Sequence, residues 1–172
     1  MTIAYFTPMV PEHGAELNAM AREAFVDTFK HLYSERNLST YLGEAYGPNG
    51  LIKDLADPAY VWRAAADARR IVGYVKLGPL GLPVPEPLPG ALELKQLYLV
   101  KDRHGQGIAA ALMDWTIATA RERGAPELYL AVFSHNERAK RFYGRYGFEE
   151  VGHCQFKVGD QLDDDRIWRR PL

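Results

Sequence analysis

The order in which helical and strand-like segments follow one another constrains the fold of this chain more than any other feature. Helical patterns dominate the first third, strand patterns follow, and the remainder alternates strand, helix, strand, helix, strand. A chain that alternated strand and helix throughout would predict a doubly wound parallel sheet. This order instead predicts an α/β (α+β) fold, in which helices flank a central sheet of mixed direction.

Local patterns give approximate bounds for these segments. Apolar residues recur every three or four positions in helices, whereas strands are rich in β-branched and aromatic residues. Helices are expected over Glu12–His31, Ser39–Ala45 (with Ser39 as N-cap), Leu51–Leu55, Gly107–Glu122 and Glu137–Tyr146. Strands are expected over Thr2–Thr7, Tyr60–Ala66, Arg70–Leu77, Ala91–Val100, Leu128–Phe133, Phe148–Val158 and Asp165–Arg170.

A proline-rich stretch separates two of these strands. Residues Gly78–Gly90 hold five prolines among thirteen residues. Proline lacks a backbone N–H group and has a fixed φ, so this stretch cannot form the interior of a helix or a strand. We predict a loop that acts as a lid or as an edge facing the substrate.

Length and composition favour one domain spanning residues 1–172. The net charge of −1 gives no reason to expect a nucleic-acid partner. The single cysteine, Cys154, excludes an intrachain disulfide and a thiolate cluster, and we expect no metal. The N-terminus lacks a basic start followed by an apolar run, and no apolar stretch is long enough to span a bilayer. We therefore expect a cytoplasmic protein without a membrane partner.

A glycine-containing turn joins the strand that ends at Val100 to the following helix. Gly105 and Gly107 let a ligand approach the backbone, and the free N–H groups at a helix start attract anions. A phosphate or pyrophosphate is the natural ligand, and a tight turn that binds nothing is the alternative. A P-loop is excluded because no Gly-Lys-Ser/Thr follows, and the missing third glycine disfavours a dinucleotide site.

A second segment, Asn136–Phe148, combines a helix cap with an ionisable aromatic side chain. Asn136 is a good N-cap, and Tyr143 follows it by seven residues, so both lie on one helical face. The Tyr143 phenol can donate a proton, although a core aromatic is the alternative interpretation.

Together the two segments resemble the GNAT superfamily of acetyltransferases, over roughly residues 72–156. The run His104-Gly105-Gln106-Gly107-Ile108-Ala109 is similar to the family signature Arg/Gln-x-x-Gly-x-Gly/Ala, with His104 in place of Arg or Gln. The second segment matches Asn-x-x-Ala-x-x-Phe-Tyr-x-x-x-Gly-Phe at every fixed position. The resemblance implies a mixed, mostly antiparallel sheet, with a coenzyme-binding core over about 91–150 and acceptor-side helices over about 11–56.

The resemblance also implies an activity and roles for individual residues. The chain would transfer the acetyl group of acetyl-CoA to a primary amine, and dimers are frequent among such proteins. Asn136 would bond the coenzyme arm, and Tyr143 would protonate the departing thiolate. Backbone groups of Leu97, Tyr98 and Leu99 would bind the pantetheine arm, and the pyrophosphate would lie on the turn of His104, Gly105, Gln106, Gly107, Ile108, Ala109 and Ala110.

The attacking amine must lose a proton before it reacts. Glu93 is the predicted base, because the family often has a carboxylate on the strand that leads to the coenzyme turn. An outward-facing residue or a partner of Lys95 is the alternative. Cys154 has no convincing partner for nucleophilic catalysis, so direct attack is predicted rather than an acetyl-enzyme.

The first third of the chain bears on the acceptor. Its aromatic residues and carboxylates suit a polyamine cation, although Phe25 and Phe29 are better read as core residues. Short runs at Ala24–Phe29 and Glu93–Tyr98 are similar to those of PaiA-type spermidine/spermine N-acetyltransferases. A protein or peptide N-acetyltransferase is the alternative, and a non-catalytic acetyl-CoA sensor is an alternative of another class.

Overall fold

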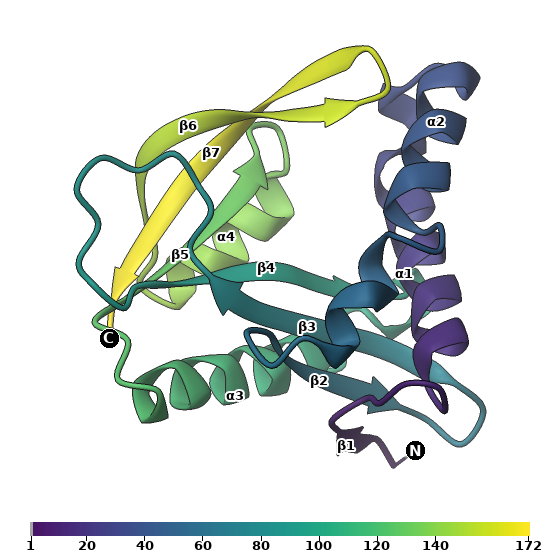
Figure 1. Ribbon diagram of the computed structural model, residues 1–172, viewed down its shortest axis with the longest axis horizontal. Helices are drawn as coiled ribbons and strands as arrows, with labels where there is room; N and C mark the ends of the chain where they lie inside the picture. The colour runs from purple at the N-terminus through teal and green to yellow at the C-terminus, as the bar shows by residue number, and fades with distance from the viewer. Residues whose placement is uncertain (1) are drawn as a thin grey trace.

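The computed structural model describes residues 2–172, and within that range the strands form one seven-stranded sheet (Figure 1). The strand order is β1-β2-β3-β4-β5-β7-β6. Only β4 and β5 run parallel, and every other neighbouring pair of these described strands is antiparallel. The predicted mixed, mostly antiparallel sheet flanked by helices is therefore confirmed.

The elements follow the order that the sequence predicts. The strands are β1 (Ala4–Phe6), β2 (Val61–Ala66), β3 (Ile71–Pro79), β4 (Leu92–Leu99), β5 (Glu127–Phe133), β6 (Glu149–Val158) and β7 (Gln161–Pro171). The α-helices are α1 (Gly14–Phe29), α2 (Glu35–Ala45), α3 (Ile108–Glu122) and α4 (Glu137–Arg145). Short 3-10 helices cover Lys30–Leu32, Leu51–Ala56 and Lys101–Arg103.

The core forms where α1 and α3 pack against the middle of the sheet. Helix α1 buries one apolar stripe that includes Leu17 and Phe25, and α3 buries Ile108, Leu112 and Met113. Both helices contact β3, whose residues are buried in succession from Ile71 to Gly78. Both faces of β3 are thus covered, which fixes the central strands rigidly beside the more open C-terminal strands.

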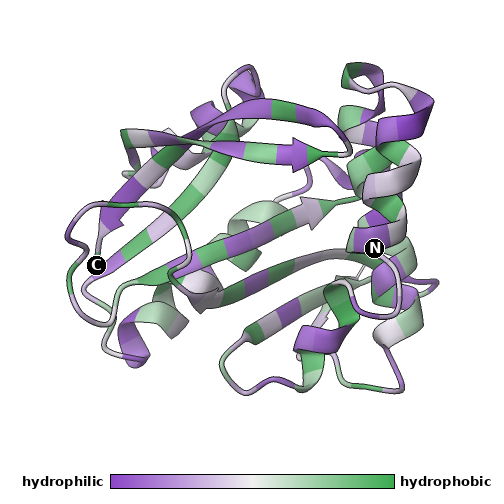
Figure 2. Cartoon of the chain, turned by 45° about the horizontal axis from the view of Figure 1, so that its top comes forward, coloured by the Kyte–Doolittle hydropathy of each residue, from purple (hydrophilic) through white to green (hydrophobic). Residues whose placement is uncertain are grey.

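Two predicted boundaries are wrong. Helix α2 begins at Glu35 rather than at Ser39, and the cap is Ser34, whose hydroxyl accepts a hydrogen bond from Asn37 N at 3.2 Å. Its polar first turn hid the helical pattern. Strand β7 begins at Gln161 rather than at Asp165, because residues 161–164 also pair with β6. From His153 to Val158 strand β6 alternates hydrophilic and hydrophobic residues, whereas β7 contains the hydrophilic run Asp163–Arg166. Figure 2 shows the chain coloured by this property.

Strands β4 and β5 pair over only a short part of their length. The ladder is limited to Leu92 with Leu128 and Glu93 with Tyr129, although β4 continues to Leu99. On its other side β4 pairs with β3 as far as Leu99, with an irregularity at Lys76/Leu77. The later residues of β4 therefore carry backbone groups that point toward β5 without ladder partners there.

Candidate active site

A cavity of about 310 Å³ lies between the diverging strands. Its walls come from α1, β4, β5, α4, β6 and β7, together with one residue of the proline-rich loop. Seven of the residues predicted for the site line this cavity, namely Glu93, Leu97, Tyr98, Leu99, His104, Asn136 and Tyr143. The fold thus collects residues that are up to fifty positions apart in the sequence.

The glycine turn begins directly after His104, and its residues Gly105–Ala110 do not line the cavity. Gly105 and Gly107 have φ values of +77° and +80°, a conformation that favours glycine, and a side chain at either would meet only open space. Helix α3 has no side-chain cap, which leaves the amides of its first residues without partners. Such free amides at a helix start fit a pyrophosphate group.

His104 connects this turn to α4. Its Nε2 lies 3.3 Å from Leu99 O, and its Nδ1 lies 2.5 Å from Nη1 of Arg138. Since the guanidinium can only donate, Nδ1 must accept, which assigns the proton to Nε2. Burial and then Arg138 hold the pKa of His104 below its ordinary value, so the ring is neutral.

Arg138 is a residue that the sequence analysis missed. Together with Lys101 and His104 it lines a second pocket of about 250 Å³ beside the turn. Its guanidinium adds positive charge where the free amides of α3 already favour an anion. Its position two residues after the Asn136 cap was a signal that could have been used.

Helix α4 and its cap carry the two motif residues for which the resemblance implies chemical roles. Asn136 is the N-cap, as predicted, and its Oδ1 accepts a hydrogen bond from Ala139 N at 3.2 Å. Tyr143 is half-buried and lines the cavity, and no hydrogen bond within residues 2–172 engages its hydroxyl. Burial raises the pKa of Tyr143 to about 12, so the phenol keeps its proton at neutral pH.

Glu93 is buried, and its Oε2 accepts two hydrogen bonds. Lys95 Nζ donates at 2.7 Å and Gly81 N donates at 2.8 Å. The contact with Lys95 is the alternative that the sequence left open, and the role of base stays a prediction. Leu82, also from the proline-rich loop, lines the cavity. The loop therefore contributes one residue to the cavity wall, and its contact with the substrate stays a prediction.

Two further carboxylates line the cavity, and both were missed. Asp163 accepts hydrogen bonds from the Tyr33 hydroxyl and from Gln161 Nε2. Asp165 has no donor within residues 2–172, although only 9% of its surface is exposed. Burial, followed by the neighbouring carboxylates, raises the pKa of Asp165 to about 6. Asp163 and Asp165 are two residues apart, so in a strand both lie on the same face. This spacing is the sequence feature that could have identified them.

Cys154 lies directly across from Asp165 in the β6–β7 ladder and also lines the cavity. It is half-buried, and burial raises the pKa of its thiol above the ordinary value. A thiol that keeps its proton is a poor nucleophile, which is consistent with direct attack by the amine.

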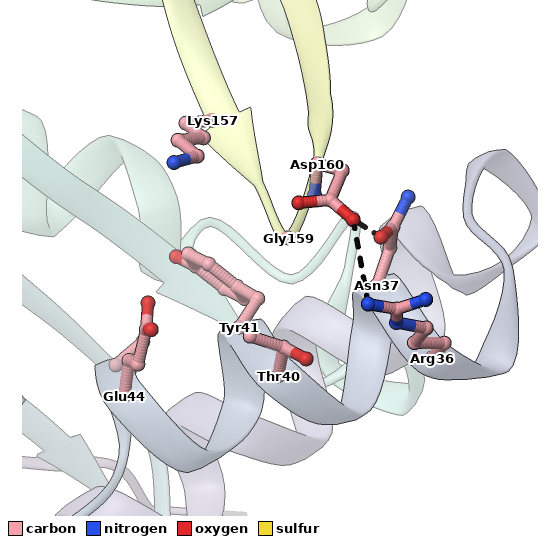
Figure 3. Close-up of a pocket in the computed structure, with 9 residues that line it drawn as sticks. Arg36, Asn37, Thr40, Tyr41, Glu44, Lys157, Gly159 and Asp160 are labelled. Carbon is pink, nitrogen blue, oxygen red and sulfur yellow. Dashed lines mark hydrogen bonds and ion pairs between the residues drawn. The ribbon is translucent and has the colours of Figure 1, made fainter.

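An outer groove of about 510 Å³ lies between α2 and the β6–β7 turn (Figure 3). Tyr41 lines both this groove and the inner cavity. The turn rests on α2: Asp160 N donates to Asn37 Oδ1 at 3.1 Å, and Arg36 lies 3.9 Å from the Asp160 carboxylate. A Cβ on Gly159 would be 2.6 Å from Asn37 Cα, so this close approach requires glycine.

Comparison with known proteins identifies the chain. A sequence profile of the Acetyltransferase (GNAT) family matches residues 18–148. This chain belongs to the GNAT family. Its members are acetyl-CoA-dependent N-acetyltransferases, so acetyl-CoA is the cosubstrate of this GNAT enzyme.

Relatives and solved structures agree with this family. The GNAT chain is 31% identical over 160 residues to an uncharacterized N-acetyltransferase of Mycobacterium bovis, covering 91% of this chain and 96% of the relative. It is 28% identical over 157 residues to one from Lactobacillus delbrueckii subsp. lactis, covering 91% of each. Its fold matches the PaiA N-acetyltransferase of Thermoplasma acidophilum, solved with coenzyme A, at 20% identity and a TM-score of 0.80 over the whole of both chains.

Two structural features are missing from the described part of this GNAT enzyme. None of the described helices has the length and apolarity needed to cross a membrane. Across residues 2–172, His, Cys, Asp and Glu side chains form no group of three that could hold a metal ion.

Proposed function

We propose that this GNAT enzyme acetylates a small cationic amine of the polyamine type. The observation that supports this acceptor is the composition of the inner cavity. Glu93, Asp163 and Asp165 bring three carboxylates to its walls, and Tyr33 and Tyr41 bring aromatic faces. Carboxylates pair with ammonium groups, and aromatic faces attract cations.

Contacts that hold the β6–β7 turn and the proline-rich loop in place support a small acceptor over a peptide. A peptide needs an open groove through which its chain can leave the reaction centre. Here the β6–β7 turn rests on α2 through Asn37 and Asp160, and the proline-rich loop contacts Glu93 through Gly81. A protein or peptide acceptor is therefore the second candidate.

The coenzyme roles follow from the arrangement of backbone groups and of α4. We propose that the backbone edge of Leu97, Tyr98 and Leu99, which has no ladder partner on β5, binds the pantetheine arm like an added strand. The amides of residues 105–110 hold the pyrophosphate, and Asn136 bonds the arm. When bound, acetyl-CoA supplies the activated acetyl group, and Tyr143 donates its proton to the sulfur that leaves.

The test is release of free coenzyme A thiol from acetyl-CoA in the presence of a panel of amines. The panel contains spermidine, spermine, small monoamines and short peptides, with a blank without amine to correct for the Cys154 thiol. We expect release that depends on the polyamines and exceeds that with peptides. Release that depends on peptides alone would contradict the proposed acceptor.

A further inference from the structure

The three carboxylates in the cavity differ in how many donors already engage them. Glu93 accepts from Lys95 Nζ and Gly81 N, and Asp163 accepts from Tyr33 and Gln161. Asp165 accepts from no donor within residues 2–172. A carboxylate stabilised by donors is a weak base, whereas one without donors binds a proton readily. Among the three carboxylates, Asp165 is thus the one that no donor of the described chain engages.

The strand pairing places Asp165 on the cavity wall. Across the sheet its neighbours are Cys154 on β6 and Phe133 on β5, and both of them line the cavity. Neighbours in register point to the same face of a sheet, so the Asp165 side chain points to that face as well. Asp164 and Arg166, which flank it, point to the other face and pair with each other at 2.7 Å.

We propose that Asp165, rather than Glu93, accepts the proton of the incoming ammonium group. This inference rests on the proposed amine acetylation and adds the identity of its base. Glu93, which contacts Lys95 and Gly81, then lines the cavity and orients the amine.

The proton and bond changes balance as follows. The ammonium group gives one proton to the Asp165 carboxylate, and the freed nitrogen forms a C–N bond with the acetyl carbon. The C–S bond breaks, and the sulfur keeps its electron pair and takes the proton of Tyr143. The second nitrogen proton returns through water to Tyr143, and Asp165 loses its proton to bulk water. An ammonium ion and an acetyl thioester become an amide, a thiol and one proton.

The electrostatic surroundings of Asp165 support this role. The charged and titratable groups that act on it are Asp163 and Asp164 on its own strand, Cys154 on β6, Tyr98 on β4 and the Tyr33 phenol after α1. None of them carries a positive charge. Burial among such groups raises the pKa of Asp165 to about 6, close enough to neutrality for a base that must also release its proton.

The experiment compares pH profiles of kcat/KM for the native chain, Asp165→Asn and Glu93→Gln. The acceptor is whichever amine or peptide the native enzyme acetylates fastest, so the base is tested even if the proposed acceptor is wrong. We expect Asp165→Asn to lose about 100-fold in kcat/KM, as removal of a general base typically does, and to lose the limb that rises near pH 6. Glu93→Gln should keep that limb.

Two controls separate a chemical role from a structural one. Asp164→Asn makes the same change on the outer face of β7. Because the Asp164 charge helps to raise the pKa of Asp165, the limb should move to slightly lower pH, but kcat/KM above the limb should be kept. Acetyl-CoA affinity, measured by calorimetry, should be equal in Asp165→Asn and the native chain. Carboxyl NMR of the free enzyme then measures the pKa of Asp165 without turnover. An ordinary pKa near 4 for Asp165, or an acidic limb that disappears only in Glu93→Gln, would overturn the proposal.

Discussion

Under the proposed function, the coenzyme side and the acceptor side of this enzyme would recognise their ligands by different means. On the coenzyme side, recognition is assigned mainly to backbone groups of β4 and of the turn at Gly105–Ala110. On the acceptor side, side chains from α1, β4, β7 and the loop before β4 converge on one cavity. Backbone recognition depends on conformation and tolerates changes of side chain, whereas recognition by convergent side chains can be redirected by a single substitution.

The largest expected effect tests the residue that lies between the two sides. Tyr143→Phe removes the proton donor but keeps the ring that packs near Phe148. We expect kcat to fall about 100-fold, as for loss of a general acid, with acetyl-CoA affinity unchanged. Steady-state kinetics and calorimetry measure the two quantities. Tyr5→Phe, on the distant strand β1, should change neither, and an unchanged kcat in Tyr143→Phe would exclude its role as acid.

The next effect concerns stability on the acceptor side. Because the folded state raises the pKa of Asp165 to about 6 from 3.8, the folded chain binds more protons than the unfolded chain between these values. The contribution of Asp165 to the unfolding free energy therefore falls as pH rises from 3.8 to about 6. Above pH 6 this loss of stability is complete. Asp165→Asn should stabilise the chain by roughly 2 kcal/mol at pH 7.5.

The gain in Asp165→Asn should shrink to roughly a third at pH 4.5, where the folded native chain already holds the proton. Urea unfolding at both pH values measures this difference. Asp164→Asn is the matched control. An equal gain in unfolding free energy of Asp165→Asn at both pH values would contradict the assignment of the effect to the Asp165 carboxyl.

A smaller effect tests backbone recognition at the coenzyme turn. Gly107→Ala places a Cβ on a residue at φ +80°, which costs about 1–2 kcal/mol and displaces the amides that follow. We expect about tenfold weaker acetyl-CoA binding together with a lower Tm. Gly124→Ala imposes the same strain at φ +73° at the other end of α3, with open space around its Cβ. It should lower Tm alike but leave affinity intact; equal loss of affinity in both variants would contradict a local role.

The smallest expected effect tests how the outer groove is closed. Gly159→Ala brings a Cβ against the backbone of Asn37 and must move the β6–β7 turn away from α2. We expect the ratio of kcat/KM for a short peptide to that for spermidine to rise severalfold. Competition between the two acceptors measures this ratio directly. Gly124→Ala serves again as the control for strain, and an unchanged ratio would mean that this contact does not limit acceptor size.

The coenzyme side was predictable from sequence because its residues lie in two short contiguous motifs. Asn136 caps the helix that carries Tyr143, and the turn needs only glycines before a helix, so both segments could be matched to the family signatures; their roles are implied by that resemblance and stay predictions. Asp163 lies before the predicted strand Asp165–Arg170, and both aspartates were missed because their place on the cavity wall depends on pairing with β5 and β6, which no local pattern reveals. Arg138 was missed because its partner, His104, lies thirty-four residues away.

Because the ladder between β4 and β5 is short, hydrogen exchange of the β4 amides can report whether the cosubstrate is bound. Backbone amides of β4 that face β3 are held in hydrogen bonds, whereas those that face β5 beyond Glu93 have no ladder partner. In deuterated water, neighbouring amides of one strand should therefore exchange at very different rates, because exchange requires a broken hydrogen bond. If the pantetheine arm occupies this edge, the fast set becomes slow on loading, and occupancy can be followed residue by residue without any acceptor present.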